Sequence, residues 1–258
     1  MNRENIWKKI FEELEAFEGS AGFCYKNLVT GEEKAYNGDR RFLAASMVKL
    51  PLFMAMMLMR ERGETDFDEM ITIRPEQKIP GGAVRYMTGD VTMDIASLAR
   101  LMIVISDSTA TNALFRHYGA EKIGSCLREL GFSETQFNRE YYSPLEFQGI
   151  NNYFVPSEIV AAFERLYAGK VISPQVSEEI LEVLCQQQID HKICGRLPEY
   201  VRVAHKTGEE DDKTHDAGIV FGSEPFIVCF AYVGAETADY NDFIRKTSEA
   251  LWLAGESR

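Results

Sequence analysis

The sequence lacks the motifs that mark several large classes of enzyme. It contains no Cys-x-x-Cys, no His-Glu-x-x-His, no Gly-x-x-x-x-Gly-Lys and no Gly-x-Ser-x-Gly. These absences argue against zinc proteases, P-loop enzymes and hydrolases built around a nucleophile elbow. We therefore expect neither a metal site nor a cofactor.

Cysteine and histidine are both scarce. The odd number of cysteines, without close pairing, is typical of free buried thiols in a reducing compartment rather than of a disulfide framework. None of the four histidines stands beside Cys or Asp in a triad-like motif, so we expect no catalytic histidine. The cysteines are Cys24, Cys126, Cys185, Cys194 and Cys229.

Acidic residues outnumber basic residues in this sequence. The 28 Lys and Arg against 40 Asp and Glu give a net charge of −12, which argues against a nucleic-acid partner. The first 14 residues alternate charged and apolar side chains at helical spacing, without the continuous apolar core of a signal peptide. As given, the chain is predicted to be cytoplasmic and to have no membrane segment. A secreted form is the alternative if a leader preceded Met1.

Apolar residues make up 45% of the 258 positions, enough for one sizeable core, and no linker or repeat divides the chain. Periodicity predicts a first helix over about 3–18, strands around Phe23 and Lys34, helices between 46 and 187, strands at 201–206, 216–221 and 226–233, and a last helix over 239–254. The expected fold is α+β. An antiparallel sheet of N- and C-terminal strands, flanked by helices, forms one lobe (about 1–45 plus 200–258), and an all-helical lobe (about 46–199) is inserted into it.

Three short motifs carry the chemistry. Ser46-Met47-Val48-Lys49 is the only Ser-x-x-Lys, and it begins an apolar helix. Residues three apart share a helix face, so the Lys49 amine can serve the Ser46 hydroxyl, provided that burial and a second cation such as Lys206 favour its neutral form. Ser106-Asp107-Ser108 and Lys206-Thr207-Gly208 follow in that order. Together the motifs predict a serine acyl-enzyme.

In motif order and in coverage of nearly the whole chain, the sequence resembles the class A β-lactamases and the penicillin-binding proteins. The resemblance implies that Ser106 relays a proton to the leaving nitrogen and that Lys206 and Thr207 hold a substrate carboxylate. It also implies that the backbone N–H of Glu209 completes an oxyanion site with that of Ser46. The implied catalytic residues are Ser46, Lys49, Ser106 and Lys206, and the implied substrate-binding residues are Ser108, Thr207, Gly208 and Glu209.

The sequence departs from the family pattern in three places. Ser108 replaces an asparagine, and the acidic run 209–212 opposes an anionic substrate unless it forms a solvated loop, which is the interpretation we favour. Where class A enzymes carry Glu-x-x-x-Asn, Glu146 and Asn151 are five residues apart. Glu146 can serve as the base for deacylation only if the loop bulges, and we favour its interpretation as a surface carboxylate, which leaves deacylation without a positioned general base.

The sequence thus predicts a β-lactamase-like serine hydrolase acting on a small molecule, a β-lactam or related amide. Two alternatives stay open at this level. One is a D-alanyl-D-alanine peptidase or esterase with the same nucleophile, and the other is a noncatalytic penicillin- or peptide-binding protein. Oligomeric state cannot be derived from the sequence.

Overall fold

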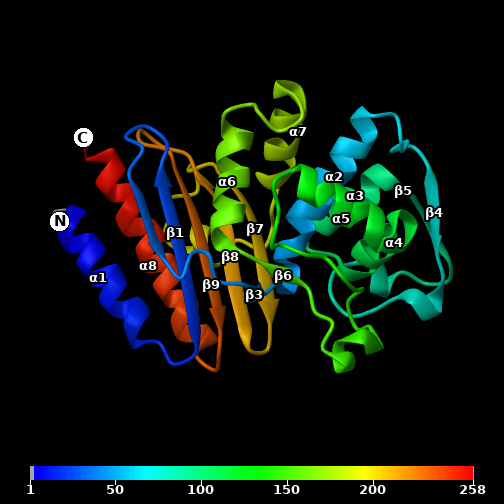
Figure 1. Ribbon diagram of the computed structural model, residues 1–258, viewed down its shortest axis with the longest axis horizontal. Helices are drawn as coiled ribbons and strands as arrows, with labels where there is room; N and C mark the ends of the chain where they lie inside the picture. Colours follow the sequence, from blue (N-terminus) through cyan, green and yellow to red (C-terminus); the bar gives the residue numbers. More distant parts are fainter. Residues whose placement is uncertain (1–2, 258) are drawn as a thin grey trace.

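The computed structural model describes residues 3–257, and its centre is a five-stranded antiparallel sheet (Figure 1). The strand order is β2-β1-β9-β8-β7. The strands are β1 (Ser20–Asn27), β2 (Glu33–Tyr36), β7 (Val203–Glu210), β8 (Lys213–Val220) and β9 (Phe226–Val233). Strands from the two ends of the chain therefore pair, as the sequence predicted, and β7 forms one edge.

Two terminal helices cover one face of the sheet, α1 (Arg3–Ala16) and α8 (Thr237–Glu256) (Figure 1). In α1, Ile6, Ile10 and Leu14 recur at helical spacing and are buried against the sheet. Their cluster also contains alternate side chains of β9, namely Phe226, Val228, Phe230 and Tyr232. This packing holds the sheet in place from the side away from the helical lobe.

The helical lobe is built around α2 (Lys49–Glu61), in which every residue from Lys49 to Met59 is buried. Such an all-round apolar helix is stable only when other helices surround it. Those helices are α3 (Ile95–Val104), α4 (Ser108–Tyr118), α5 (Ala120–Glu129) and α7 (Pro174–Leu184). The α+β class with an inserted helical lobe is confirmed. Helix α6 (Pro156–Tyr167) packs on β1, β8 and β9 as well as on α7.

Two small sheets were not predicted: β3 (Phe42–Leu43) with β6 (Tyr153–Phe154), and β4 (Met70–Ile73) with β5 (Val91–Asp94). Helix α3 begins at Ile95, because Asp94 accepts a hydrogen bond from the Ser97 N–H at 2.6 Å and caps it. Five 3₁₀ turns complete the chain: η1 (Ala45–Val48), η2 (Pro75–Gln77), η3 (Val84–Tyr86), η4 (Pro144–Gln148) and η5 (Ile193–Arg196).

The solvated loop expected for the acidic run covers only half of it: Asp211 and Asp212 form an exposed turn, whereas Glu209 and Glu210 are exposed residues of a strand. Strand β7 continues through Glu210, and Glu209 and Glu210 pair with Thr214 and Lys213 of β8. The Lys213 ammonium lies 2.9 Å from the Glu210 carboxylate and 2.5 Å from that of Asp212, which offsets the repulsion within the run.

None of the helices in the described part of the chain is long and apolar enough to cross a membrane.

Replacing Phe163 by alanine tests the packing of α6 on the sheet. Its ring is fully buried in the larger core cluster, so Phe163→Ala should lower the free energy of unfolding by about 3–5 kcal/mol in urea titrations. Phe147 is 93% exposed and serves as the matched control. Phe147→Ala should change the free energy of unfolding by less than about 0.5 kcal/mol. Equal effects would contradict this packing.

Candidate active site

Ser46 lies in η1, where the helical lobe meets strand β7. The preceding residue, Ala45, has a φ of +40°, a strained conformation for a residue with a side chain. Gly208 permits the close approach of the strand, because a Cβ atom there would lie 3.2 Å from the Ser46 nitrogen and 3.2 Å from Met47 Cγ. A side chain at 208 would push β7 away from Ser46.

Two lysines converge on Ser106. Lys49 Nζ donates to the Ser106 carbonyl at 2.6 Å and lies 3.1 Å from its hydroxyl, and Lys206 Nζ lies 3.1 Å from that same hydroxyl. Ser106 reaches both because it occupies the left-handed region, with a φ of +56°, in the turn between α3 and α4. The motifs predicted from sequence therefore meet at one oxygen atom.

Both lysines are fully buried, and this sets their charge. Burial lowers the pKa of Lys49 to about 7, although Asp107 and Glu210 act in the opposite direction. Burial also lowers the pKa of Lys206, and the nearby charge of Lys49 lowers it further. Near neutral pH a large fraction of Lys49 is therefore the free amine, which can accept a proton.

Asp107 organises the Ser106-Asp107-Ser108 turn. One carboxylate oxygen caps α4 by accepting from the Ala110 N–H at 2.8 Å, and the other accepts from Ala83 N at 2.6 Å and Val84 N at 2.9 Å. A Cβ at Gly82 would fall 2.2 Å from the same carboxylate, so only glycine fits. The Gly81-Gly82 pair forms one wall of the site.

Tyr141 was missed by the sequence analysis. Its ring lies against the Lys49 amine, 4.7 Å from the ring centre, and its hydroxyl donates to the Ala45 carbonyl at 2.8 Å. Burial raises the pKa of the Tyr141 phenol and Glu210 adds to the rise, while a hydrogen bond with the Ser46 side chain opposes it. Tyr141 therefore keeps its proton beside Ser46.

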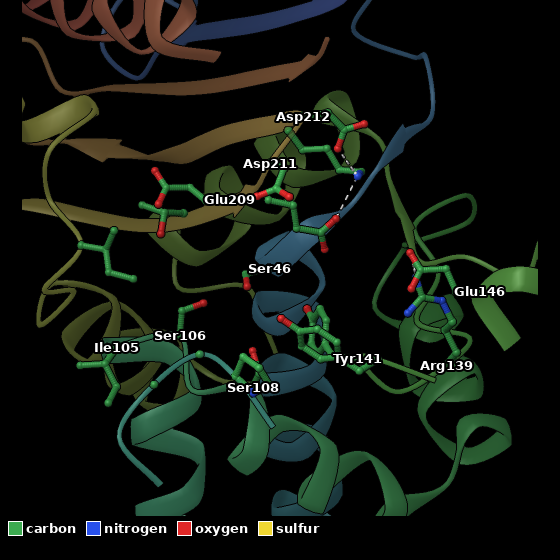
Figure 2. A pocket seen from close by; sticks show the side chains of 18 residues that line it. Ser46, Ile105, Ser106, Ser108, Arg139, Tyr141, Glu146, Glu209, Asp211 and Asp212 are labelled. Atoms are coloured by element: carbon green, nitrogen blue, oxygen red, sulfur yellow. Dashed lines mark hydrogen bonds and ion pairs between the residues drawn. The ribbon is translucent and has the colours of Figure 1, made fainter. Parts of the chain in front are cut away.

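These groups surround a cavity of about 490 Å³ (Figure 2). Five of the eight predicted site residues line it: Ser46, Ser106, Ser108, Thr207 and Glu209. The other three, Lys49, Lys206 and Gly208, are held behind this surface by the contacts described above. Ser108 Oγ is 3.4 Å from Lys49 Nζ, so the serine that replaces asparagine still contacts the lysine, weakly.

Glu146 lies at the rim of the same cavity (Figure 2). Its carboxylate is 3.0 Å from Arg139 Nη2, and its side chain is 49% exposed. In Figure 2 the Arg139–Glu146 pair stands to one side, and Tyr141 is nearer to Ser46. Among the described residues, Lys49 forms no ion pair with a carboxylate.

Ser46 at the start of the buried helix of Lys49, together with two buried lysines on Ser106 and a sheet with an inserted helical lobe, places this protein among the β-lactamase-like serine hydrolases. The chain belongs to the beta-lactamase enzyme family, whose family model matches residues 5–254. The family resemblance in the three motifs is thereby confirmed.

Individual relatives agree with this assignment. The chain is 28% identical over 137 residues to the beta-lactamase regulatory protein BlaB of Streptomyces cacaoi, a match that spans 52% of this chain and 44% of that protein. A beta-lactamase structure from Sphaerobacter thermophilus superposes with a TM-score of 0.90 at 25% identity, covering 100% of this chain and 99% of that one. PBP-A shares the fold, with a TM-score of 0.89, 24% identity and coverage of 99% and 97%.

Removing the Asp107 carboxylate should destabilise the site strongly. Asp107→Ala leaves three backbone N–H groups without an acceptor, so the free energy of unfolding should fall by about 3–5 kcal/mol in urea titrations. Asp94→Ala removes a cap that accepts from one N–H and should cost about 1 kcal/mol. A loss at Asp107 no larger than that at Asp94 would contradict the bridging role.

Proposed function

We propose that the protein hydrolyses β-lactams and related activated amides through an acyl-enzyme on Ser46, and that this acyl-enzyme is released slowly. The observation that carries the proposal is the buried pair of lysines around the Ser106 hydroxyl, directly behind a cavity that contains Ser46. The Lys49 amine, buried beside Lys206, can act as a general base near neutral pH in its neutral form.

In acylation, Ser46 Oγ attacks the amide carbonyl carbon while its proton passes to the Lys49 amine. The backbone N–H groups of Ser46 and Glu209 would hold the oxygen that becomes negative. Collapse of the tetrahedral intermediate breaks the C–N bond, and the Ser106 hydroxyl gives its proton to the leaving nitrogen. Ser106 recovers a proton from Lys49, so the lysine returns to its neutral form. The geometry that supports this relay is the contact of Ser106 Oγ with both lysines, each at 3.1 Å.

Deacylation needs a second base to activate water, and the surroundings of Ser46 offer a poor one. Tyr141 stands beside Lys49 as a protonated phenol, and Arg139 holds Glu146 at the rim. Loss of a positioned general base costs about a hundredfold to ten-thousandfold in rate. We infer that the acyl-enzyme accumulates.

Intact-protein mass measured after mixing with penicillin G tests this function. One acyl group should attach and persist for many minutes, the adduct should map to Ser46, and a chromogenic cephalosporin should be hydrolysed slowly. Ser46→Ala should abolish both signals. Ser223→Ala, which changes a serine in the turn after β8, should leave both intact.

Rapid hydrolysis without an adduct would overturn slow release, and Glu146→Gln would then show whether Glu146 is the missing base. An adduct that forms equally on Ser46→Ala would overturn the choice of nucleophile.

The cavity rim is acidic, which bears on substrate preference. Glu209, Glu210, Asp211 and Asp212 all line the cavity, and the cations that line it already have carboxylate partners. Lys213 lies between Glu210 and Asp212, and Arg139 is paired with Glu146. We propose that a positively charged group on the substrate's acyl side chain is favoured by this field.

Ampicillin and penicillin G differ by one side-chain amine and form a matched pair of probes. Ampicillin should acylate Ser46 about two- to tenfold faster at low salt, as expected for one added charge in a partly solvated field. The ratio should shrink at 1 M salt and in Asp211→Asn. A ratio that favours penicillin G, or one that does not respond to salt, would refute the preference. Either result leaves acylation itself untouched.

A further inference from the structure

A second set of reactive groups lies on the other side of strand β7 from the lysines. His205 and Lys206 are neighbours on β7, so their side chains point to opposite faces of the sheet. Lys206 faces Ser106, whereas His205 contacts Cys194 of η5, a turn that packs against α8. No triad-like motif along the sequence marks His205, because its partners Cys194 and Asp216 are distant from it in the chain.

Cys194, His205 and Asp216 form a linear array. Cys194 Sγ is 3.5 Å from His205 Nε2, and His205 Nδ1 is 3.0 Å from Asp216 Oδ1. Asp216 is fixed in turn, because its second oxygen accepts from the Ile193 N–H at 3.1 Å. The carboxylate thus orients the imidazole and sets Nε2 toward the sulfur, the arrangement by which a base activates a thiol.

Burial and charge decide the protonation of the imidazole. His205 is 2% exposed and Asp216 fully buried, whereas Cys194 is partly exposed. Burial lowers the pKa of His205, but the charge and hydrogen bond of Asp216, together with Cys194, outweigh it and raise this pKa to about 10. At neutral pH His205 is therefore an imidazolium whose Nε2–H points at the sulfur.

Other charged groups around the array do not cancel this effect. Lys192 precedes Ile193, and Asp216 raises its pKa while burial lowers it. Arg245 of α8 packs beside Gly195, and Arg202 donates to Cys185 rather than to Cys194. Among the described groups, Asp216 is the carboxylate hydrogen-bonded to His205, so the cation nearest to the sulfur is the imidazolium.

We propose that Cys194, whose sulfur lies 3.5 Å from His205 Nε2, is a reactive thiol and a modification site for small disulfides and other soft electrophiles. No cavity is needed for such reagents, because the sulfur is partly exposed at the surface of η5. The site is independent of Ser46 and of the reaction proposed there.

The chemistry is thiol–disulfide exchange. The Cys194 thiol loses its proton to solvent, and the thiolate, stabilised by the neighbouring His205 imidazolium, attacks one sulfur of a disulfide such as oxidised glutathione. The new S–S bond forms as the old one breaks, and glutathione leaves as a thiolate that takes a proton from water. Electrons balance within the exchange, so the disulfide itself is the only oxidant.

The experiment compares Cys194 with Cys185, a second partly exposed thiol. Burial raises the pKa of Cys185, with Arg202 opposing, and no histidine contacts its sulfur. Iodoacetamide labelling between pH 6 and 8, read by peptide mass spectrometry, should give a nearly constant rate at Cys194 and a rate at Cys185 that rises with pH. At pH 6.5 Cys194 should be at least about tenfold faster. Oxidised glutathione should add one glutathione, on Cys194.

Three controls separate reactivity from exposure. Cys194→Ser should remove the fast label while Cys185→Ser leaves it, and in denaturant both cysteines should react at similar, pH-dependent rates. His205→Gln should restore an ordinary pH dependence at Cys194. If His205→Gln does not fold, the pH dependence of Cys194 labelling in the unaltered protein still tests the proposal. A Cys194 rate that rises with pH like that of Cys185, or fails to exceed it, would overturn the proposal.

Discussion

Two buried lysine amines share one serine hydroxyl, and the other features of the site depend on that constraint. Lys49 and Lys206 are both fully buried, and each lies 3.1 Å from Ser106 Oγ. Two ammonium ions cannot occupy such a place cheaply, so at least one must give up its proton. Because burying the charge costs free energy, the lysine pKa falls, and the neutral amine that results is a base near neutral pH.

Neither lobe can build this arrangement alone. Lys49 begins the buried helix α2, and Ser106 comes from the turn before α4, whereas Lys206 comes from the edge of the sheet. The two lobes can come this close only with a glycine at position 208, because β7 passes the backbone of Ser46 there. The same edge strand continues into Glu209 and Glu210, so the strand that supplies the buried cation also supplies the acidic rim.

The sequence predicted what local patterns encode. Ser46 and Lys49 are one helical turn apart, and the strands and helices follow from periodicity, so the fold class and the convergence of the motifs could be expected. Tyr141 gave no local signal, because its role depends on a loop folding back against Lys49. The link between Cys194 and His205 was equally hidden, since it crosses from η5 to β7. In the acidic run, Asp211 and Asp212 form a turn as expected, but Glu209 and Glu210 belong to the hairpin, because pairing with β8 and with Lys213 extends it beyond what residue type suggests.

The central claim is that Lys49 is a neutral base near physiological pH, and its titration tests this most directly. Lysine side chains labelled with ¹³C at Cε report protonation by NMR, and the Lys49 signal can be assigned by its loss in Lys49→Gln. We predict a midpoint near pH 7, because burial lowers the Lys49 pKa to about 7. A midpoint near 10.4, the value of an ordinary solvated lysine, would contradict the account.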